Sequence, residues 1–160
     1  MIHGDDHRTW DADPRMMRRA AACCSAIGNE TKAGTSKYVA SVLPRISGKY
    51  EENLDSESLL HTVSVTTRHI DGSMNSQERN GILQWLAEES DNERECRVVT
   101  NVRCLSEGVD VPSLDAVLFL SARNSQVDVV QSVGRVMRTF HKGQSDEKKY
   151  GYILSILDIS

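Results

Sequence analysis

The sequence contains no apolar run of the roughly eighteen residues that a membrane-spanning helix needs. Its N-terminus, Met-Ile-His-Gly-Asp-Asp-His, also lacks the charged-then-apolar layout of a signal peptide, so we expect a cytoplasmic protein without a membrane partner. Excess positive charge is absent as well, since 19 Lys and Arg stand against 23 Asp and Glu, for a formal net charge of -4. This balance argues against a module that grips nucleic acid through overall positive charge, and any such contact must be local.

The cysteines lack the spacing of a metal-binding motif. No C-x-x-C pair occurs among the four of them, Cys23, Cys24, Cys96 and Cys104. We therefore predict no zinc site, no other metal site and no disulfide framework, and we interpret the cysteines as buried free thiols.

A phosphate-binding loop of the Gly-x-x-x-x-Gly-Lys-Ser/Thr type is also missing. Such a loop would need glycine where Leu43 stands before Gly48, and Ser or Thr where Tyr50 stands. The only Asp-Glu pair, Asp146-Glu147, lies in a charged stretch rather than at the end of a predicted strand. The sequence therefore assigns neither magnesium ligands nor a catalytic base.

Apolar runs alternate with segments of helical period along most of the chain. Residues 1–14 are polar and end at Pro14, which is typical of a tail or an interdomain linker, so we assign the domain to residues 15–160. Strands that alternate with helices predict an α/β fold with a mainly parallel sheet covered by helices on both faces. The patterns predict strands near 19–25, 63–70, 96–99, 116–120 and 152–157, and helices near 30–46, 75–87 and 126–138.

Local signals refine this pattern. Asn75, with Glu78 three residues later, predicts a capping box at the start of the second helix. Pro44 interrupts the first helix and weakens the prediction of its last turn. The polar stretch 47–62 is predicted to be a solvated loop with a short helical piece, and the charged stretch 141–149 a surface loop.

The strongest candidate site is the segment Gln131-Ser-Val-Gly-Arg135-Val-Met-Arg138. At about 100° per residue, Gln131, Arg135 and Arg138 fall within roughly 60° of one another on a helix. We expect the opposite side of the helix to be buried, and it carries Val129, Val130, Val133, Val136 and Met137. Two guanidiniums and an amide on one stripe favour an anion site, while salt bridges to Asp or Glu are equally compatible with this geometry.

A second candidate segment, Thr100-Asn101-Val-Arg-Cys-Leu-Ser-Glu-Gly108-Val-Asp110-Val-Pro112, directly follows a predicted strand. Loops that leave the carboxyl ends of parallel strands are where such sheets bind ligands. Gly108 allows close approach of the backbone, and Asp110 offers a carboxylate suited to a ribose hydroxyl. Taken alone, the segment also fits an ordinary connection between two strands.

Together the two segments resemble motifs V and VI of superfamily 2 helicases and translocases, T-N-x-x-x-x-x-E-G-x-D-x-P and then Q-x-x-G-R-x-x-R. The stretch from Asp71 to Arg79 resembles the strand, turn and Glu-Arg helix that precede motif V, although Asp71 stands where relatives often have histidine. The segment Leu-Ser-Glu-Gly-Val-Asp-Val-Pro is similar to the corresponding segment in motor domains of bacterial type I, type III and single-polypeptide restriction systems. The resemblance covers residues 17–157.

The resemblance implies a RecA-like three-layer domain, the second of two motor domains with ATP and Mg²⁺ held mainly by the first. Arg138, with Arg135 beside it, would be the arginine finger, and both would face outward at the carboxyl edge of the sheet. The nucleotide would also meet Gly108, Asp110 and Gln131. The sugar-phosphate backbone of DNA would be touched by Thr100, Asn101, Ser25 and Gly72.

Half of an active site should not hydrolyse ATP by itself, because an arginine finger acts only after nucleotide, metal and water have been positioned. Two other functions remain compatible with the sequence. One is a RecA-like module that binds nucleic acid or protein without ATP turnover. The other is an unrelated α/β enzyme that binds a small phosphorylated substrate through Arg135 and Arg138.

Overall fold

A computed structural model describes residues 15–102, 114–121, 126–138, 142–144, 147–148 and 150–155. The predicted tail, residues 1–14, lies outside this part of the chain, so the proposed domain boundary stays a prediction. Within the described part, no helix has the length and apolar character needed to cross a membrane.

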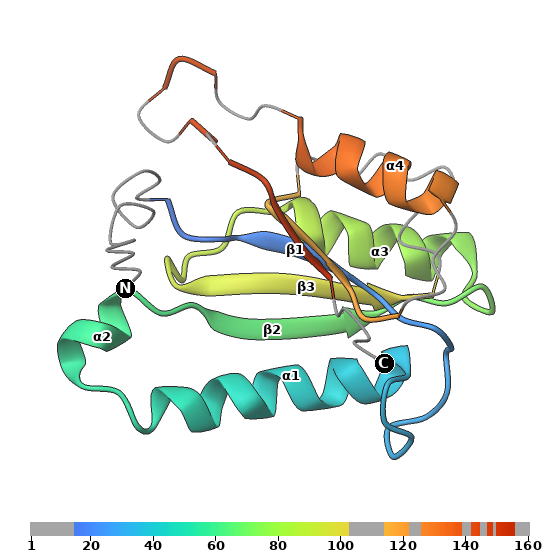
Figure 1. Cartoon of the computed structure of the whole chain (residues 1–160), viewed down its shortest axis with the longest axis horizontal. Coiled ribbons are helices and arrows are strands. Elements are labelled where there is room, and N and C mark those ends of the chain that lie inside the picture. The colour runs from blue at the N-terminus through green and yellow to red at the C-terminus, as the bar shows by residue number, and fades with distance from the viewer. Residues whose placement is uncertain are drawn as a thin grey trace, which may run out of the picture.

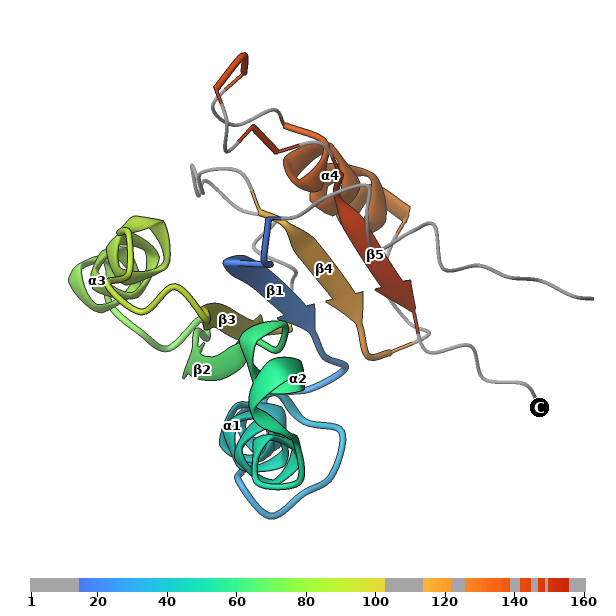
Figure 2. The same cartoon turned by 90° about the vertical axis from the view of Figure 1, so that its left-hand side faces the viewer.

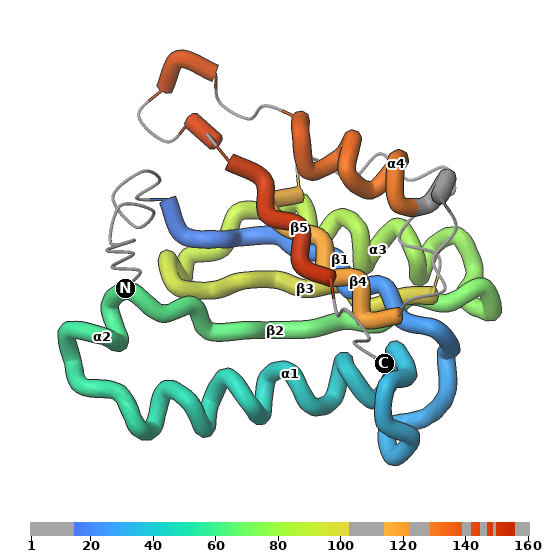
Figure 3. Tube along the Cα trace, viewed as in Figure 1, coloured from blue at the N-terminus to red at the C-terminus, as the bar shows by residue number. Residues whose placement is uncertain are grey.

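The described elements alternate along the chain as predicted (Figures 1 and 3). All strand pairs are parallel, and the strand order in the sheet is β2-β3-β1-β4-β5. The elements are β1 (Arg19–Cys23), α1 (Ser36–Glu51), α2 (Ser56–Leu60), β2 (Ser64–His69), α3 (Ser76–Ala87), β3 (Glu95–Asn101), β4 (Ala116–Phe119), α4 (Gln126–Val136) and β5 (Tyr152–Ser155).

Helices cover both faces of the sheet, so the predicted three-layer arrangement is confirmed. Figures 1 and 2 show α1 and α2 on one face, and α3 and α4 on the other. The central strand β1 serves both layers, because Ala21 and Cys23 belong to the core beneath α3 and α4, while Ala20 and Ala22 belong to the core beneath α1. Its small side chains follow the period of two expected for a strand that is buried on both faces.

The second predicted helix begins where its capping signal places it. The Asn75 side chain accepts from the Glu78 amide, and the Glu78 carboxylate accepts from the Asn75 amide. Two of the amides that a helix start leaves without partners are thereby satisfied. Leu86, near the end of the same helix, is fully buried against the sheet.

The first helix differs from its prediction at both ends. It begins at Ser36 and continues through Pro44 to Glu51, so the expected weakening at Pro44 is wrong. Proline has no amide to donate to the carbonyl of Ala40, four residues earlier. Thr67 of β2 supplies the missing donor, because its hydroxyl donates to the Ala40 carbonyl oxygen at 2.5 Å. The predicted loop 47–62 is correspondingly shorter, and it contains α2.

Two expectations about single residues are corrected. Lys148 lies in the predicted surface loop but is only 5% exposed, because its ammonium finds backbone carbonyls inside the fold. Cys24 and Cys96 are buried free thiols as expected, whereas Cys23 is disulfide-bonded. Pairing between cysteines far apart in a chain leaves no signal in their spacing.

Candidate functional site

Four of the predicted site residues gather at the carboxyl edge of three neighbouring strands. Thr100 and Asn101 end β3, Ser25 follows β1, and Gly72 follows β2. The register pairs Asn101 with Cys23 and Thr100 with His69, so these strand ends lie side by side. Ser25 and Gly72 are exposed, while Asn101 is 9% exposed and Thr100 is fully buried.

The buried Thr100 hydroxyl is engaged within the protein. It donates to the Ser36 carbonyl oxygen at 2.9 Å, while the Thr100 carbonyl accepts from the Ile70 amide at 2.9 Å. Thr100 thus ties the end of β3 to the first residue of α1 and to the end of β2. A direct contact between Thr100 and a ligand stays a prediction.

Next to Thr100, three side chains that were not predicted from the sequence form a hydrogen-bonded series. The Ser36 hydroxyl lies 3.1 Å from His69 Nδ1, and His69 Nε2 lies 3.0 Å from Asp71 Oδ2. A signal for His69 was available, because Val65, Thr67 and His69 alternate along β2 and so share its α1-facing side. This hydrogen-bonded series holds the turn at Gly72 against α1.

Asp71 is the electrostatic anchor of that turn. Its carboxylate accepts from the hydroxyl and the amide of Ser73, and Lys37 lies 3.9 Å away. The Ser73 hydroxyl contributes most to lowering the pKa of Asp71 to about 2, the Ser73 amide and His69 lower it further, and burial opposes them. Asp71 is therefore ionised across the physiological range.

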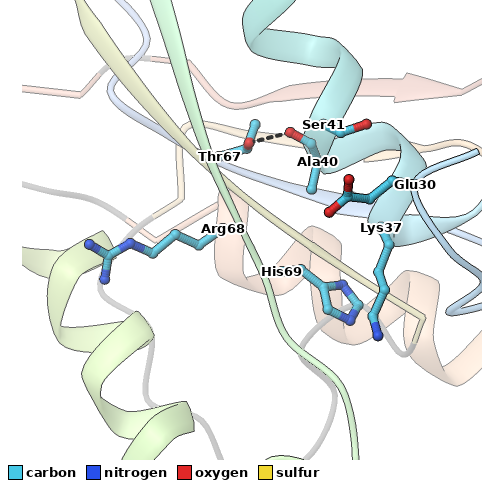
Figure 4. Close-up of a pocket in the computed structure, with 7 residues that line it drawn as sticks. All are labelled: Glu30, Lys37, Ala40, Ser41, Thr67, Arg68 and His69. Atoms are coloured by element: carbon cyan, nitrogen blue, oxygen red, sulfur yellow. Dashed lines mark hydrogen bonds between the residues drawn. The ribbon is translucent and has the colours of Figure 1, made fainter.

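A pocket of about 370 Å³ lies between α1 and the edge strand β2 (Figure 4). In the close-up, Lys37 and His69 lie near each other at one end, while Arg68 points away toward α3. The Arg68 guanidinium is stacked on Trp85 of α3, 4.5 Å from the ring centroid. The pocket is lined by Glu30, Lys37, Ala40, Ser41, Thr67, Arg68 and His69, and none of them is a predicted site residue.

The α4 segment presents its predicted polar residues on the accessible side. Gln131 and Arg138 are exposed, and Arg135 is partly exposed. The helix ends at Val136, so Arg138 stands two residues beyond it. The expected apolar side is only partly right, because Val129, Val133 and Val136 face inward whereas Val130 is 70% and Met137 is 68% exposed.

The expectation that both arginines lie at the carboxyl edge of the sheet is wrong. Helix α4 returns antiparallel to β4, so its last turn lies beside the first residues of β4 and β5 (Figure 1). Lys148 demonstrates this placement, because its ammonium donates both to the Leu114 carbonyl before β4 and to the Val136 carbonyl at the end of α4. The structure thus separates the α4 arginines from the carboxyl-edge group of Ser25, Gly72, Thr100 and Asn101.

The accessible side chains of Gln131, Arg135 and Arg138 suit a phosphate-bearing ligand. Guanidinium and amide groups on one accessible surface match phosphate oxygens. In the described part of the chain, no group of three His, Cys, Asp or Glu side chains is placed to hold a metal. Gly108 and Asp110, predicted to meet the nucleotide, lie outside the described residues.

The chain matches a helicase domain family and shares its fold with two solved structures. The family described as "Helicase conserved C-terminal domain" matches residues 39–140. The "ATP-dependent Type ISP restriction-modification enzyme LlaBIII bound to DNA" is similar with 38% identity and a TM-score of 0.66, over 87% of this chain and 8% of the enzyme. The C-terminal part of the Fun30 ATPase domain shares the fold, with 12% identity and a TM-score of 0.51, over 90% of this chain and 36% of that one.

A curated relative extends the comparison to a virus. "Putative helicase 22" of Sulfolobus islandicus filamentous virus (isolate Iceland/Hveragerdi) is 34% identical over 61 residues, which are 38% of this chain and 10% of that protein. This chain therefore spans only a small part of the restriction enzyme and of the viral protein. The predicted RecA-like fold and the resemblance to restriction-type motors are confirmed.

Proposed function

Because the chain belongs to the helicase conserved C-terminal domain family, we propose that it is the second motor domain of an ATP-dependent DNA helicase or translocase. The observation that carries this proposal is the accessible group formed by Gln131 and Arg135 of α4 and by Arg138 just beyond the end of that helix. The 38% identical neighbour, whose name describes an ATP-dependent enzyme bound to DNA, supports ATP as the proposed nucleotide and DNA as the proposed nucleic acid.

Arg138 is the proposed arginine finger, with Arg135 beside it. In such a site, fixed guanidiniums neutralise the charge that develops on the transferred phosphoryl group. Arg138 is exposed and stands just beyond the end of α4, so a neighbouring domain can bring a triphosphate to it. Gln131 lies on the same side and would help to orient the phosphates.

The exposed apolar residues of α4 support a partner domain at the same surface. Val130 and Met137, seven residues apart, are both exposed and lie on one side of the polar residues, with the exposed Gly134 next to them. Met and Arg are among the residues enriched at protein interfaces. We propose that the first RecA-like domain covers this side of α4 and carries ATP and Mg²⁺ to it.

Gly108 and Asp110 remain our candidates for the nucleotide sugar. Both follow β3 in the sequence, and loops after the strands of a parallel sheet are where such sheets bind ligands. A carboxylate there suits a ribose hydroxyl, which is the role we propose for Asp110.

The carboxyl edge of the sheet is the proposed DNA track. Ser25 and Gly72 are exposed there and can approach a sugar-phosphate backbone, with Asn101 beside them and Thr100 supporting the edge from within. Contacts of this kind go to phosphates rather than to bases. We expect DNA binding that is independent of sequence and weakened by salt.

Reconstitution tests the proposal. The 160-residue chain alone should show no ATPase activity, and addition of the first RecA-like domain should produce ATPase activity that DNA stimulates. DNA binding without any ATP turnover in the reconstituted pair would favour the non-catalytic binding module. Turnover of a small phosphorylated compound by the chain alone would favour the unrelated enzyme.

A further inference from the structure

A buried lysine holds the end of α4. The Lys148 ammonium donates to the carbonyl oxygens of Leu114 and Val136, and lies 3.3 Å from that of Arg138. An ammonium has three donors, so these three carbonyls use its whole capacity. Lys148 therefore fixes the backbone of Arg138 against the start of β4.

Gly151 braces the same helix end from the β5 side. A Cβ added to Gly151 would lie 2.2 Å from Val136 Cγ1 and 2.8 Å from the Val136 carbonyl oxygen. Both distances are far shorter than a van der Waals contact, so only glycine lets the chain run this close to α4. Val136 itself is fully buried, which leaves the helix end no room to move inward.

From these contacts we infer that Lys148 is a positioning residue, which together with Gly151 sets the place of Arg138 for its contact with a phosphoryl group. This inference rests on the proposed function of Arg138. The geometry gives Lys148 a particular importance, because Arg138 lies beyond α4 and its amide makes a long hydrogen bond, 3.4 Å, to the Arg135 carbonyl. The Lys148 ammonium is a further contact that orients the Arg138 backbone.

Lys148 acts through its hydrogen bonds in a buried site. Its pKa is lowered, chiefly by burial and further by the Arg15 guanidinium, while the Asp115 carboxylate opposes this shift. Asp115 is itself held by Arg15 and by the amides of Arg18 and Arg19. A methionine at position 148 would fill the space but leave the carbonyls of Leu114 and Val136 without their shared donor.

Hydrogen exchange on the 160-residue chain tests, without ATP, whether Lys148 holds the end of α4 in place. In Lys148→Met, the amides of Met137 and Arg138 should exchange about tenfold faster than in the unsubstituted chain. The matched control is Lys142→Met, which removes an exposed lysine from the preceding segment and should leave both rates unchanged. Equal exchange rates of these amides in Lys148→Met and in the control would show that Lys148 does not hold the end of α4.

ATPase kinetics of the reconstituted two-domain motor test the functional step. Lys148→Met should lower kcat by about 100-fold with little change in KM for ATP, since small displacements of a group that contacts the reacting atoms cost this much. In an Arg138→Ala background, the same substitution should lower kcat by less than about twofold, because the Arg138 guanidinium is no longer there to be misplaced. A merely structural role would lower activity equally in both backgrounds and would contradict the inference.

Gly151→Ala provides a second variant if Lys148→Met folds poorly. It keeps the ammonium and displaces Val136 from the other side, so it should show the same dependence on Arg138. If Arg138→Ala leaves kcat unchanged, the proposed function itself fails. If Arg138→Ala lowers kcat but neither Lys148→Met nor Gly151→Ala does, only the positioning role fails.

Discussion

Replacing Thr67 by valine removes one hydroxyl and changes the shape of the side chain little, so it isolates the hydrogen bond to the Ala40 carbonyl. That carbonyl has no helical partner, because residue 44 is proline. Thr67→Val therefore leaves a partly buried acceptor with no donor from its own helix.

The loss in free energy of unfolding expected for Thr67→Val follows from the unpartnered Ala40 carbonyl. A buried polar group without a partner costs about 1–3 kcal/mol. The site is partly buried at the edge of the sheet, and valine favours a strand slightly more than threonine does, so we expect about 1–2 kcal/mol of lost stability. Thr67→Ser keeps the hydroxyl and removes only a methyl group, so it controls for the change in packing.

Urea denaturation of the unsubstituted chain, the two single variants Thr67→Val and Pro44→Ala, and the double variant measures the effect as a double-mutant cycle. In a Pro44→Ala background, residue 44 regains an amide that donates to the Ala40 carbonyl, and Thr67→Val should then cost less than about 0.5 kcal/mol. A cost of Thr67→Val that is the same with proline or alanine at position 44 would refute the reasoning. It would show that the Thr67 hydroxyl does not replace the missing amide.

Three further predictions concern stability. The folded pKa of Asp71, about 2, lies below its ordinary value of 3.8, so its contribution should be complete above about pH 4 and lost as pH falls through 2; because the pKa values of Asp55 and Glu95 are also lowered, urea midpoints should fall in both proteins but by more in the unsubstituted chain than in Asp71→Asn. Gly81→Ala, in an exposed turn of α3 with open space around it, should stabilise the fold by about 0.5–1 kcal/mol in the same assay, and a destabilised variant would contradict the packing described. Arg19→Met removes donors from the carbonyls of Leu86 and Ala87 and should cost about 2–4 kcal/mol, whereas Glu89→Gln, which weakens only the exposed ion pair with Arg19, should cost less than about 1 kcal/mol.

Local sequence patterns predicted the architecture, because each pattern lies within the helix or strand that it identifies. The Asn75 and Glu78 pair identified the start of α3, and the alternation around Val65 identified β2. The small residues of β1 identified a strand that is buried on both faces. In each case the residues that carry the signal are neighbours in the sequence.

The corrections arise where a distant residue decides the outcome. Pro44 continues a helix because Thr67, from another element, supplies a donor. Lys148 is buried because three carbonyls from two parts of the chain converge on it. The arginines at the end of α4 lie at the opposite edge from the one expected, because a helix that connects two parallel strands runs back across the sheet, and the sequence analysis considered only helix period.

The central claim is that Arg138 completes an ATP site whose other half belongs to a neighbouring domain. The most direct measurement is single-turnover ATP hydrolysis by the reconstituted two-domain motor, compared between the unsubstituted chain and Arg138→Ala, alongside the affinity of each for ATP. The account predicts a fall in the hydrolysis rate of about 1,000-fold or more with ATP binding largely retained. Hydrolysis at an undiminished rate in Arg138→Ala would contradict it.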